Sequence, residues 1–158
     1  MVYPIKNYTR TFANTDSRQN YKYIPMAVYT DGTWGQARVV LAQNNDAGYT
    51  ARVFNCDENE ALSVIIAWFS GTVDALWSYK FYAAALASGE TLTWNLINGT
   101  NYNLDNTNAS KLHYLTYNIT SGSWENGDMI RIAINNNEAN NISFLSGYLR
   151  GTMEYDTT

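Results

Sequence analysis

Two apolar runs near the middle of the sequence constrain the fold more than any other feature. Residues 62–69 read LSVIIAWF and residues 76–85 read LWSYKFYAAA. Both runs are rich in β-branched and aromatic side chains, which suit the half-buried surface of a pleated sheet. In the second run Trp77, Tyr79 and Phe81 alternate with more polar residues, which predicts a strand with one face in the core. The first run has no polar face, so we expect it in the middle of a sheet or against an interface.

The connection between the two runs contains Gly71 and Asp74. Such residues favour a turn, so we expect the two runs to form an antiparallel pair. The alanines that follow Tyr82 favour helix, which leaves a short helix over residues 82–87 as an alternative.

Shorter segments on both sides of this pair alternate in the same way, and turn residues separate them. We expect strands or parts of strands at residues 8–12, 21–29, 37–42, 49–54, 91–97, 112–119, 129–134 and 144–155. Two Asn-rich segments, 98–108 and 135–141, read as loops. Many short strands at regular spacing predict an all-β fold, an antiparallel β-sandwich of jelly-roll type. Glycines in the last strand predict a bulge or bend there.

The chain of 158 residues has the size of one domain. We predict a β-sandwich domain over residues 21–158 and an extended N-terminal arm over residues 1–20, with a frayed terminus as the alternative. The inward positions of the predicted strands give a core made of Val64, Ile66, Trp68, Trp77, Tyr79, Phe81, Leu115, Ile130, Ile132 and Leu149.

Composition and charge exclude several classes of partner. Lys and Arg number only ten, they form no cluster, and the formal net charge is −4, so we expect no nucleic-acid partner. No apolar run is long enough to span a membrane and no leader precedes the domain, so we expect no membrane association. Cys56 is the single cysteine, which rules out an internal disulfide and favours a reducing compartment.

The sequence lacks the residue sets that catalysis requires. His113 is the only histidine and lies inside a predicted strand, so it reads as a packed or surface residue rather than a base. No His/Cys cluster suits zinc, and no Gly-rich loop suits phosphate. We therefore predict that the protein is not an enzyme and needs no cofactor.

Acidic and amide side chains gather in four loops. Residues 57–60 and 125–128 carry carboxylates, but a glycosidase needs two of them at a set separation, which this spacing does not define. Residues 44–46 and 135–138 offer oxygen ligands, yet neither has the spacing of a known calcium loop. We read all four as solvated loops and predict no catalytic or metal site.

Aromatic residues are the remaining signal, with thirteen Tyr and five Trp. These are more rings than one sandwich core of this size readily buries, so we expect some at the surface as interface anchors. Surface rings could also stack on sugars. The candidate interface residues are Tyr3, Tyr8, Tyr21, Tyr23, Trp34 and Trp124.

The order of several motifs resembles a known group of proteins. The motifs are LSVIIAW at 62–68, LWSYKF at 76–81, GDMIRIAI at 127–134 and YLRGTMEY at 148–155. In this order they resemble a β-sandwich found among structural proteins of tailed bacteriophages, namely capsid-decorating, head-fibre and neck or tail accessory proteins. Related sequences place Arg and Asp before the closing strand, whereas this chain has Asn at 135–141, so the resemblance does not extend to an ion pair between subunits there.

The resemblance implies a non-enzymatic virion structural protein that is assembled in the host cytoplasm. Its expected partners are the major capsid protein or other virion proteins and further copies of itself. By analogy with decoration of three-fold lattice positions, we expect a homotrimer. The alternative, from a different class, is a carbohydrate-binding, lectin-like module that uses surface Trp and Tyr. A glycan hydrolase ranks third.

Overall fold

The computed structural model describes residues 20–30, 33–35, 39–70, 75–98, 102–106, 111–137 and 139–153. At residues 29–30, 33–35, 75–76 and 102–106 only the backbone is described. The described residues form strands, turns and loops and contain no helix that could span a membrane. The predicted N-terminal arm, apart from Asn20, and the predicted strand at residues 8–12 lie outside the described residues.

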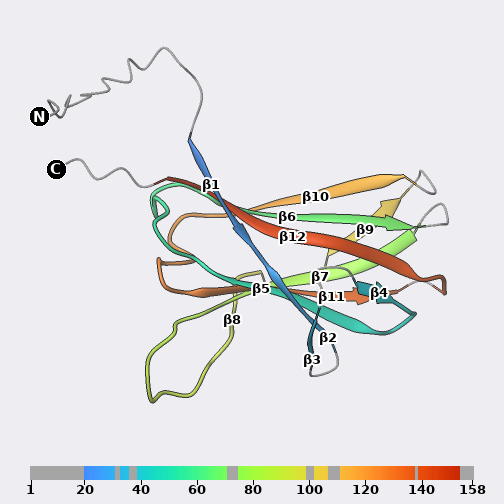
Figure 1. The fold of residues 1–158 in the computed structure, drawn as a ribbon, viewed down its shortest axis with the longest axis horizontal. Helices are drawn as coiled ribbons and strands as arrows, with labels where there is room; N and C mark the ends of the chain where they lie inside the picture. The colour runs from blue at the N-terminus through green and yellow to red at the C-terminus, as the bar shows by residue number, and fades with distance from the viewer. Residues whose placement is uncertain are drawn as a thin grey trace, which may run out of the picture.

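The strands form two antiparallel sheets that face each other (Figure 1). Sheet A has the order β1 (Tyr21–Pro25), β12 (Ile142–Thr152), β6 (Leu62–Ser70) and β10 (Leu112–Ile119), and β4 (Val39–Leu41) also pairs with β12. Sheet B has the order β3 (Thr33–Gly35), β2 (Ala27–Thr30), β5 (Asp46–Arg52), β11 (Met129–Asn136), β7 (Ala75–Ala84) and β8 (Asn95–Leu96), and β9 (Tyr102–Asn106) pairs with β7. In each sheet a late strand lies between two early ones, which is the jelly-roll arrangement. The predicted antiparallel β-sandwich is confirmed.

Alternating side chains build the core between the two sheets. Along β11 the exposure alternates strictly, and Ile130, Ile132 and Ile134 face inward. All ten residues predicted for the core are buried. The Trp77 ring meets the Trp68 ring of the other sheet in an edge-on contact, with centroids 5.5 Å apart. The core therefore depends on aromatic contacts that join the two layers.

The two central apolar runs are strands, but the prediction that they pair with each other is wrong. In sheet A, β6 lies between β12 and β10, and in sheet B, β7 pairs with β11, β8 and β9. Each run has a complete apolar inward face, and these faces bury each other only when the strands lie in opposite sheets. The period-two pattern gave the buried face correctly and left the neighbouring strand undetermined.

Several other boundaries differ from the prediction. The strand β9 lies within the Asn-rich segment that was expected to be a loop, and β8 is shorter than predicted. The alternative helix is absent, because Ala83 and Ala84 end β7 and the next described residues form a loop. The predicted irregularity in the last strand is a register shift between Phe144 and Ser146. It immediately precedes Gly147, where a Cβ would lie 2.8 Å from side-chain atoms of both Ile66 and Tyr49.

Candidate functional site

Two of the predicted interface residues lie on the outer face of sheet A. Tyr21 and Tyr23 on β1 are 39% and 56% exposed. The Tyr23 ring contacts the Tyr148 ring at 5.6 Å, and the Arg150 guanidinium lies 4.7 Å from the Tyr21 ring. On β10, at the other edge of this face, Tyr114 is 61% exposed. Outward-facing tyrosines therefore lie on three of the sheet's strands.

The expectation that Trp124 lies at the surface is wrong. Its side chain is only 2% exposed and belongs to the hydrophobic core. The side chain of Asn126 binds both the backbone N–H and the backbone carbonyl of Cys56, at 3.0 and 2.7 Å, and these bonds hold the loop over the end of the sandwich. The indole then turns inward although its sequence neighbours are polar.

The other predicted interface residues have no described side chain. Trp34 is placed in β3 by its backbone alone. Tyr3 and Tyr8 lie outside the described residues. His113 faces inward, and its ring lies 5.1 Å from the Trp68 ring, as expected for a packed histidine.

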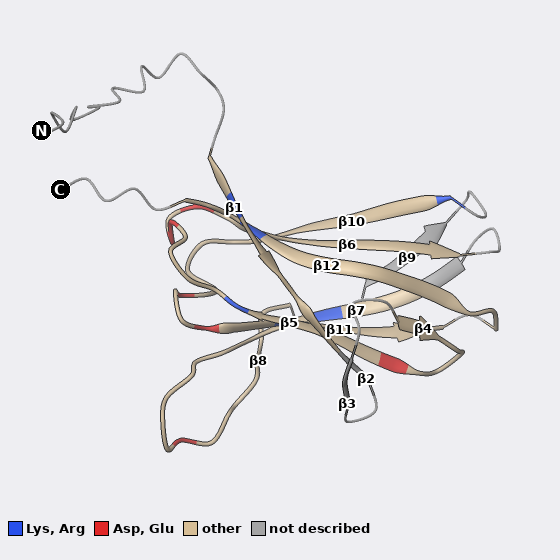
Figure 2. Ribbon diagram, viewed as in Figure 1, with Lys and Arg blue, Asp and Glu red and all other residues tan. Residues whose placement is uncertain are grey.

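The two acidic loops meet at one end of the sandwich, where several acidic positions lie close together (Figure 2). Glu58 accepts a hydrogen bond from the backbone N–H of Asn126 at 2.6 Å, and Asp128 accepts one from the backbone N–H of Glu125 at 3.0 Å. Among the described residues, no group of three or more His, Cys, Asp or Glu could hold a metal ion. These carboxylates cap loop backbone and order the end of the sandwich.

A more distinctive arrangement lies on the outer face of sheet B. The strands β5, β11 and β7 are adjacent, and their register places outward-facing residues in three rows. From β5 to β7 the rows are Asp46–Asn135–Ser78, Gly48–Ala133–Lys80 and Thr50–Arg131–Tyr82. The first row is polar, the middle row contains the two smallest residues, and the third combines a cation with a ring.

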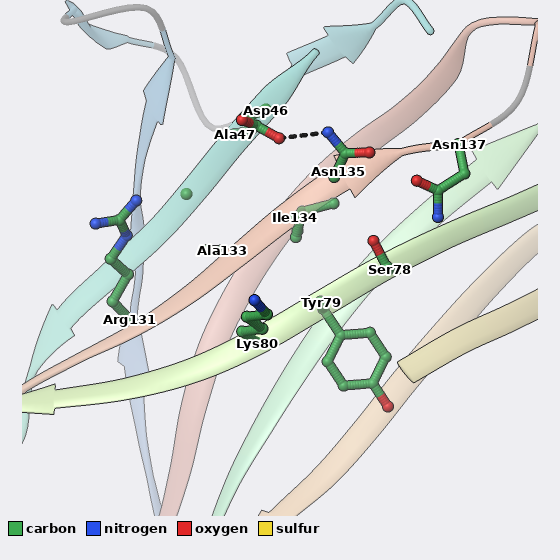
Figure 3. A pocket seen from close by; sticks show the side chains of 11 residues that line it. Asp46, Ala47, Ser78, Tyr79, Lys80, Arg131, Ala133, Ile134, Asn135 and Asn137 are labelled. Carbon is green, nitrogen blue, oxygen red and sulfur yellow. Dashed lines mark hydrogen bonds between the residues drawn. The ribbon is translucent and has the colours of Figure 1, made fainter. Parts of the chain in front are cut away.

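The middle row produces a depression in the sheet surface. Gly48 has no side chain and Ala133 has a single methyl group, so the surface is low between their neighbours. The depression has a volume of about 460 Å³ and is open to solvent (Figure 3). Asn137, which follows β11, also lines it. Arg131 lies partly over the glycine, because its Nε is 3.3 Å from the position that a Cβ on Gly48 would take.

The rim of the depression carries hydrogen-bonding groups of both kinds, and two aromatic rings lie next to one of its residues, Arg131. The Asn135 amide donates a hydrogen bond to the Asp46 carboxylate. The guanidinium carbon of Arg131 lies 5.6 Å from the Trp94 ring and 5.9 Å from the Tyr82 ring. Cations and rings at these distances attract each other. These contacts hold the guanidinium beside the depression.

Sequence reasoning found parts of this site but not the site itself. The segments that contain Asp46 and Asn135 were noted separately as sources of oxygen ligands, and the register of β5 and β11 brings them together. One carboxylate among the described side chains, with Arg131 and Lys80 nearby, is a poor set for a divalent cation. The signal that could have found the site is a small outward residue on each of two neighbouring strands, Gly48 and Ala133. It becomes visible only when their pairing is known.

Neither a protein family nor a curated protein matches the sequence. Solved structures with a similar fold include a xylan-binding module CBM15, with 10% identity and a TM-score of 0.47, over 87% of this chain and all of that one. A xylan-binding domain from CBM22 has 11% identity and a TM-score of 0.38, over 92% of this chain and 94% of that one. The enzymatically active domain of bacteriophage CBA120 tailspike protein 4 has 14% identity and a TM-score of 0.40, over 85% of this chain and 19% of that one. At these values the likenesses carry no inference about what this chain binds.

Proposed function

We propose that this protein is a carbohydrate-binding β-sandwich that holds a glycan in the depression on the outer face of sheet B. The observation that supports the proposal is the three-row arrangement around Gly48 and Ala133. A sugar presents hydroxyl groups that both donate and accept hydrogen bonds, together with apolar C–H faces. Amide, carboxylate and hydroxyl groups that line the depression match the hydroxyls, and the small apolar surface of Gly48 and Ala133 can accommodate a C–H face.

The size and shape of the depression suit part of a longer glycan. Its volume of about 460 Å³ lies within the range of ligand pockets, which is roughly 300–1,000 Å³. The middle row runs from Gly48 on β5 across Ala133 on β11 to Lys80 on β7. Gly48 and Ala133 are too small to obstruct a ligand that lies along it. A chain laid along this row would find polar groups on one side and Arg131 with its rings on the other.

We propose binding without hydrolysis. Hydrolysis of a glycosidic bond generally requires two carboxyl groups that flank the bond. Among the described side chains that line the depression, Asp46 is the single carboxylate, and it already accepts a hydrogen bond from Asn135. Binding and orientation are the chemistry that this set supports.

The test is a glycan array followed by calorimetry on matched variants of the two sheets. Ala133→Tyr fills the depression, whereas Thr116→Tyr puts the same ring on the outer face of β10. Asn135→Ala removes a polar group from the rim, whereas Asn118→Ala makes the same change on sheet A. We expect the two sheet B variants to lose binding and the two sheet A variants to keep it. Absence of any glycan ligand, or loss in the sheet A variants instead, would refute the proposal.

The virion location, the major capsid protein as partner and the homotrimer stay predictions from the sequence resemblance. A glycan site on sheet B leaves the exposed tyrosines of sheet A available for contacts with protein. Light scattering at micromolar concentration checks self-association. A trimer should have three times the mass of the 17.8 kDa chain, and a stable monomer would contradict it.

A further inference from the structure

We infer that the glycan bound in the depression is acidic, and that Arg131 and Lys80 bind its carboxylate or sulfate group. This inference rests on the proposed function, because it specifies the ligand of the same depression. It concerns the charge of the ligand, which the hydrogen-bonding groups of the rim leave open.

Lys80 and Arg131 lie on two sides of Ala133, which forms the bottom of the depression. Lys80 on β7 lies directly opposite Ala133 on β11, and Arg131 precedes Ala133 by two positions on the same face. Figure 3 shows the Arg131 guanidinium directed toward β5, while Lys80 rises from β7 on the other side of β11. An anionic group above Ala133 would therefore have a positive charge on either side.

Neither cation is neutralised by a described side chain. Arg131 has ring partners, and no ion pair joins Arg131 or Lys80 to a carboxylate that the structure describes. The single carboxylate at the rim, Asp46, lies in the first row and is bonded to Asn135. In a chain with a formal net charge of −4, two cations that have no carboxylate partner among the described residues thus lie beside one depression. Such a site attracts anions.

The guanidinium is held in an orientation that suits a carboxylate or sulfate. Contacts with the Trp94 and Tyr82 rings restrict its motion, so less conformational freedom is lost when a ligand binds. A planar guanidinium donates two parallel hydrogen bonds to such an anion, which an ammonium group does not. Gly48 is part of this arrangement, because a Cβ at that position would crowd Nε of Arg131.

The test uses the full chain on an array that presents each acidic glycan beside its neutral counterpart, such as oligogalacturonic acid and its methyl ester, together with sulfated oligosaccharides. We expect binding to the acidic members, and the carboxylate and sulfate series distinguish the two sources of charge. For the preferred pair, calorimetry should show about tenfold tighter binding of the acidic form, since charge-assisted bonds are roughly twice as strong as neutral ones.

Variants then assign the charge effect to residues. Arg131→Gln should remove the preference for the acidic form, Arg131→Lys should restore part of it, and Lys80→Gln should weaken it. Arg150→Gln on sheet A is the matched control and should leave it unchanged. Circular dichroism confirms that each variant is folded.

The outcomes separate the inference from the proposed function. Equal binding of acidic and neutral forms, with loss on Ala133→Tyr, would overturn the acidic ligand and leave a neutral glycan in the depression. If no glycan on the array binds, both the acidic ligand and the proposed function would be overturned. If inorganic sulfate displaces the oligosaccharide at an equal concentration, the depression binds any small anion, and this result would also overturn the inference.

Discussion

The outer faces of the two sheets carry similar residues, but the shape of the surface around them differs. Each face has an arginine beside an aromatic ring, with Arg150 4.7 Å from Tyr21 on sheet A and Arg131 5.9 Å from Tyr82 on sheet B. On sheet A the Arg150 guanidinium donates to Ser63 at 3.4 Å, and its Nε is buried with no hydrogen-bond partner among the described residues. On sheet B the arginine borders a depression instead.

The difference arises from the residues next to each arginine. Opposite Arg150 on sheet A lies Ser63, whose hydroxyl donates to Asn118 at 2.7 Å, so polar side chains occupy the surface. On sheet B the row next to Arg131 contains Gly48 and Ala133, which leave the surface low. An arginine beside an aromatic ring is therefore common to both faces, and a depression lies beside the arginine of sheet B, where Gly48 and Ala133 are in register next to it.

Alanine substitutions at one glycine of each sheet should differ most in their effect on the free energy of unfolding. Gly147→Ala on β12 should lower the free energy of unfolding by about 1–3 kcal/mol, because the new Cβ would lie 2.8 Å from ring and side-chain atoms in the core. Gly48→Ala on β5 should cost less than about 1 kcal/mol, because its close neighbour is the Arg131 side chain at 3.3 Å, which lies on the outer face and has to shift by only a few tenths of an ångström. Urea unfolding followed by tryptophan fluorescence measures both.

For glycan affinity we expect the opposite order, with the larger loss in Gly48→Ala. Gly48→Ala displaces Arg131 and should weaken the binding of an acidic glycan, whereas Gly147→Ala should leave the affinity of the folded fraction unchanged. If Gly48→Ala affected stability alone and left the affinity unchanged, Gly48 would have no role in binding.

The fold of the core was readable from the sequence, and the arrangement of strands was only partly so. Period-two alternation identified β10 and most of β11 and placed Ile130 and Ile132 in the core, because burial of one face imposes this pattern. Alternation does not specify which strand lies alongside, which is why the two central runs were wrongly paired. Trp124 was wrongly placed at the surface because hydrogen bonds between Asn126 and Cys56, distant in sequence, turn its loop inward.

The candidate site was harder to predict than the core for the same reason. Arg131 and Lys80 were recognisable as outward residues of their strands, but Gly48 gave no sign of its role. The site exists because Gly48 and Ala133 are partners in register across β5 and β11, and register between distant strands is a tertiary property.

The next effect compares the rings that accompany the two arginines. Tyr82→Ala removes a ring contact of Arg131 and should weaken glycan binding by about fivefold, the magnitude expected for loss of roughly 1 kcal/mol of ring contact and orientation. Tyr21→Ala removes the ring contact of Arg150 and should leave the affinity unchanged. Calorimetry measures the affinity of both variants, and an equal loss in both would contradict a specific role of the Arg131 ring contact in binding.

Salt should have the smallest effect, and it should act on the glycan affinity that depends on Arg131 rather than on the stability contributed by Arg150. Arg131 lies beside an open depression, so mobile ions screen its attraction for an anionic ligand, over a distance of about 10 Å at 0.1 M salt and about 3 Å at 1 M. The affinity for an acidic glycan should therefore fall several-fold over this range, while the affinity for its neutral counterpart stays nearly constant. Arg150 makes its contacts within the surface of sheet A, so the stability difference between the native protein and Arg150→Gln should change little over the same range. Calorimetry and urea unfolding at matched salt concentrations test the two halves of this prediction. A salt-independent affinity would mean that the ligand does not meet Arg131 through its charge, and a salt-dependent cost of Arg150→Gln would mean that both arginines are equally open to solvent.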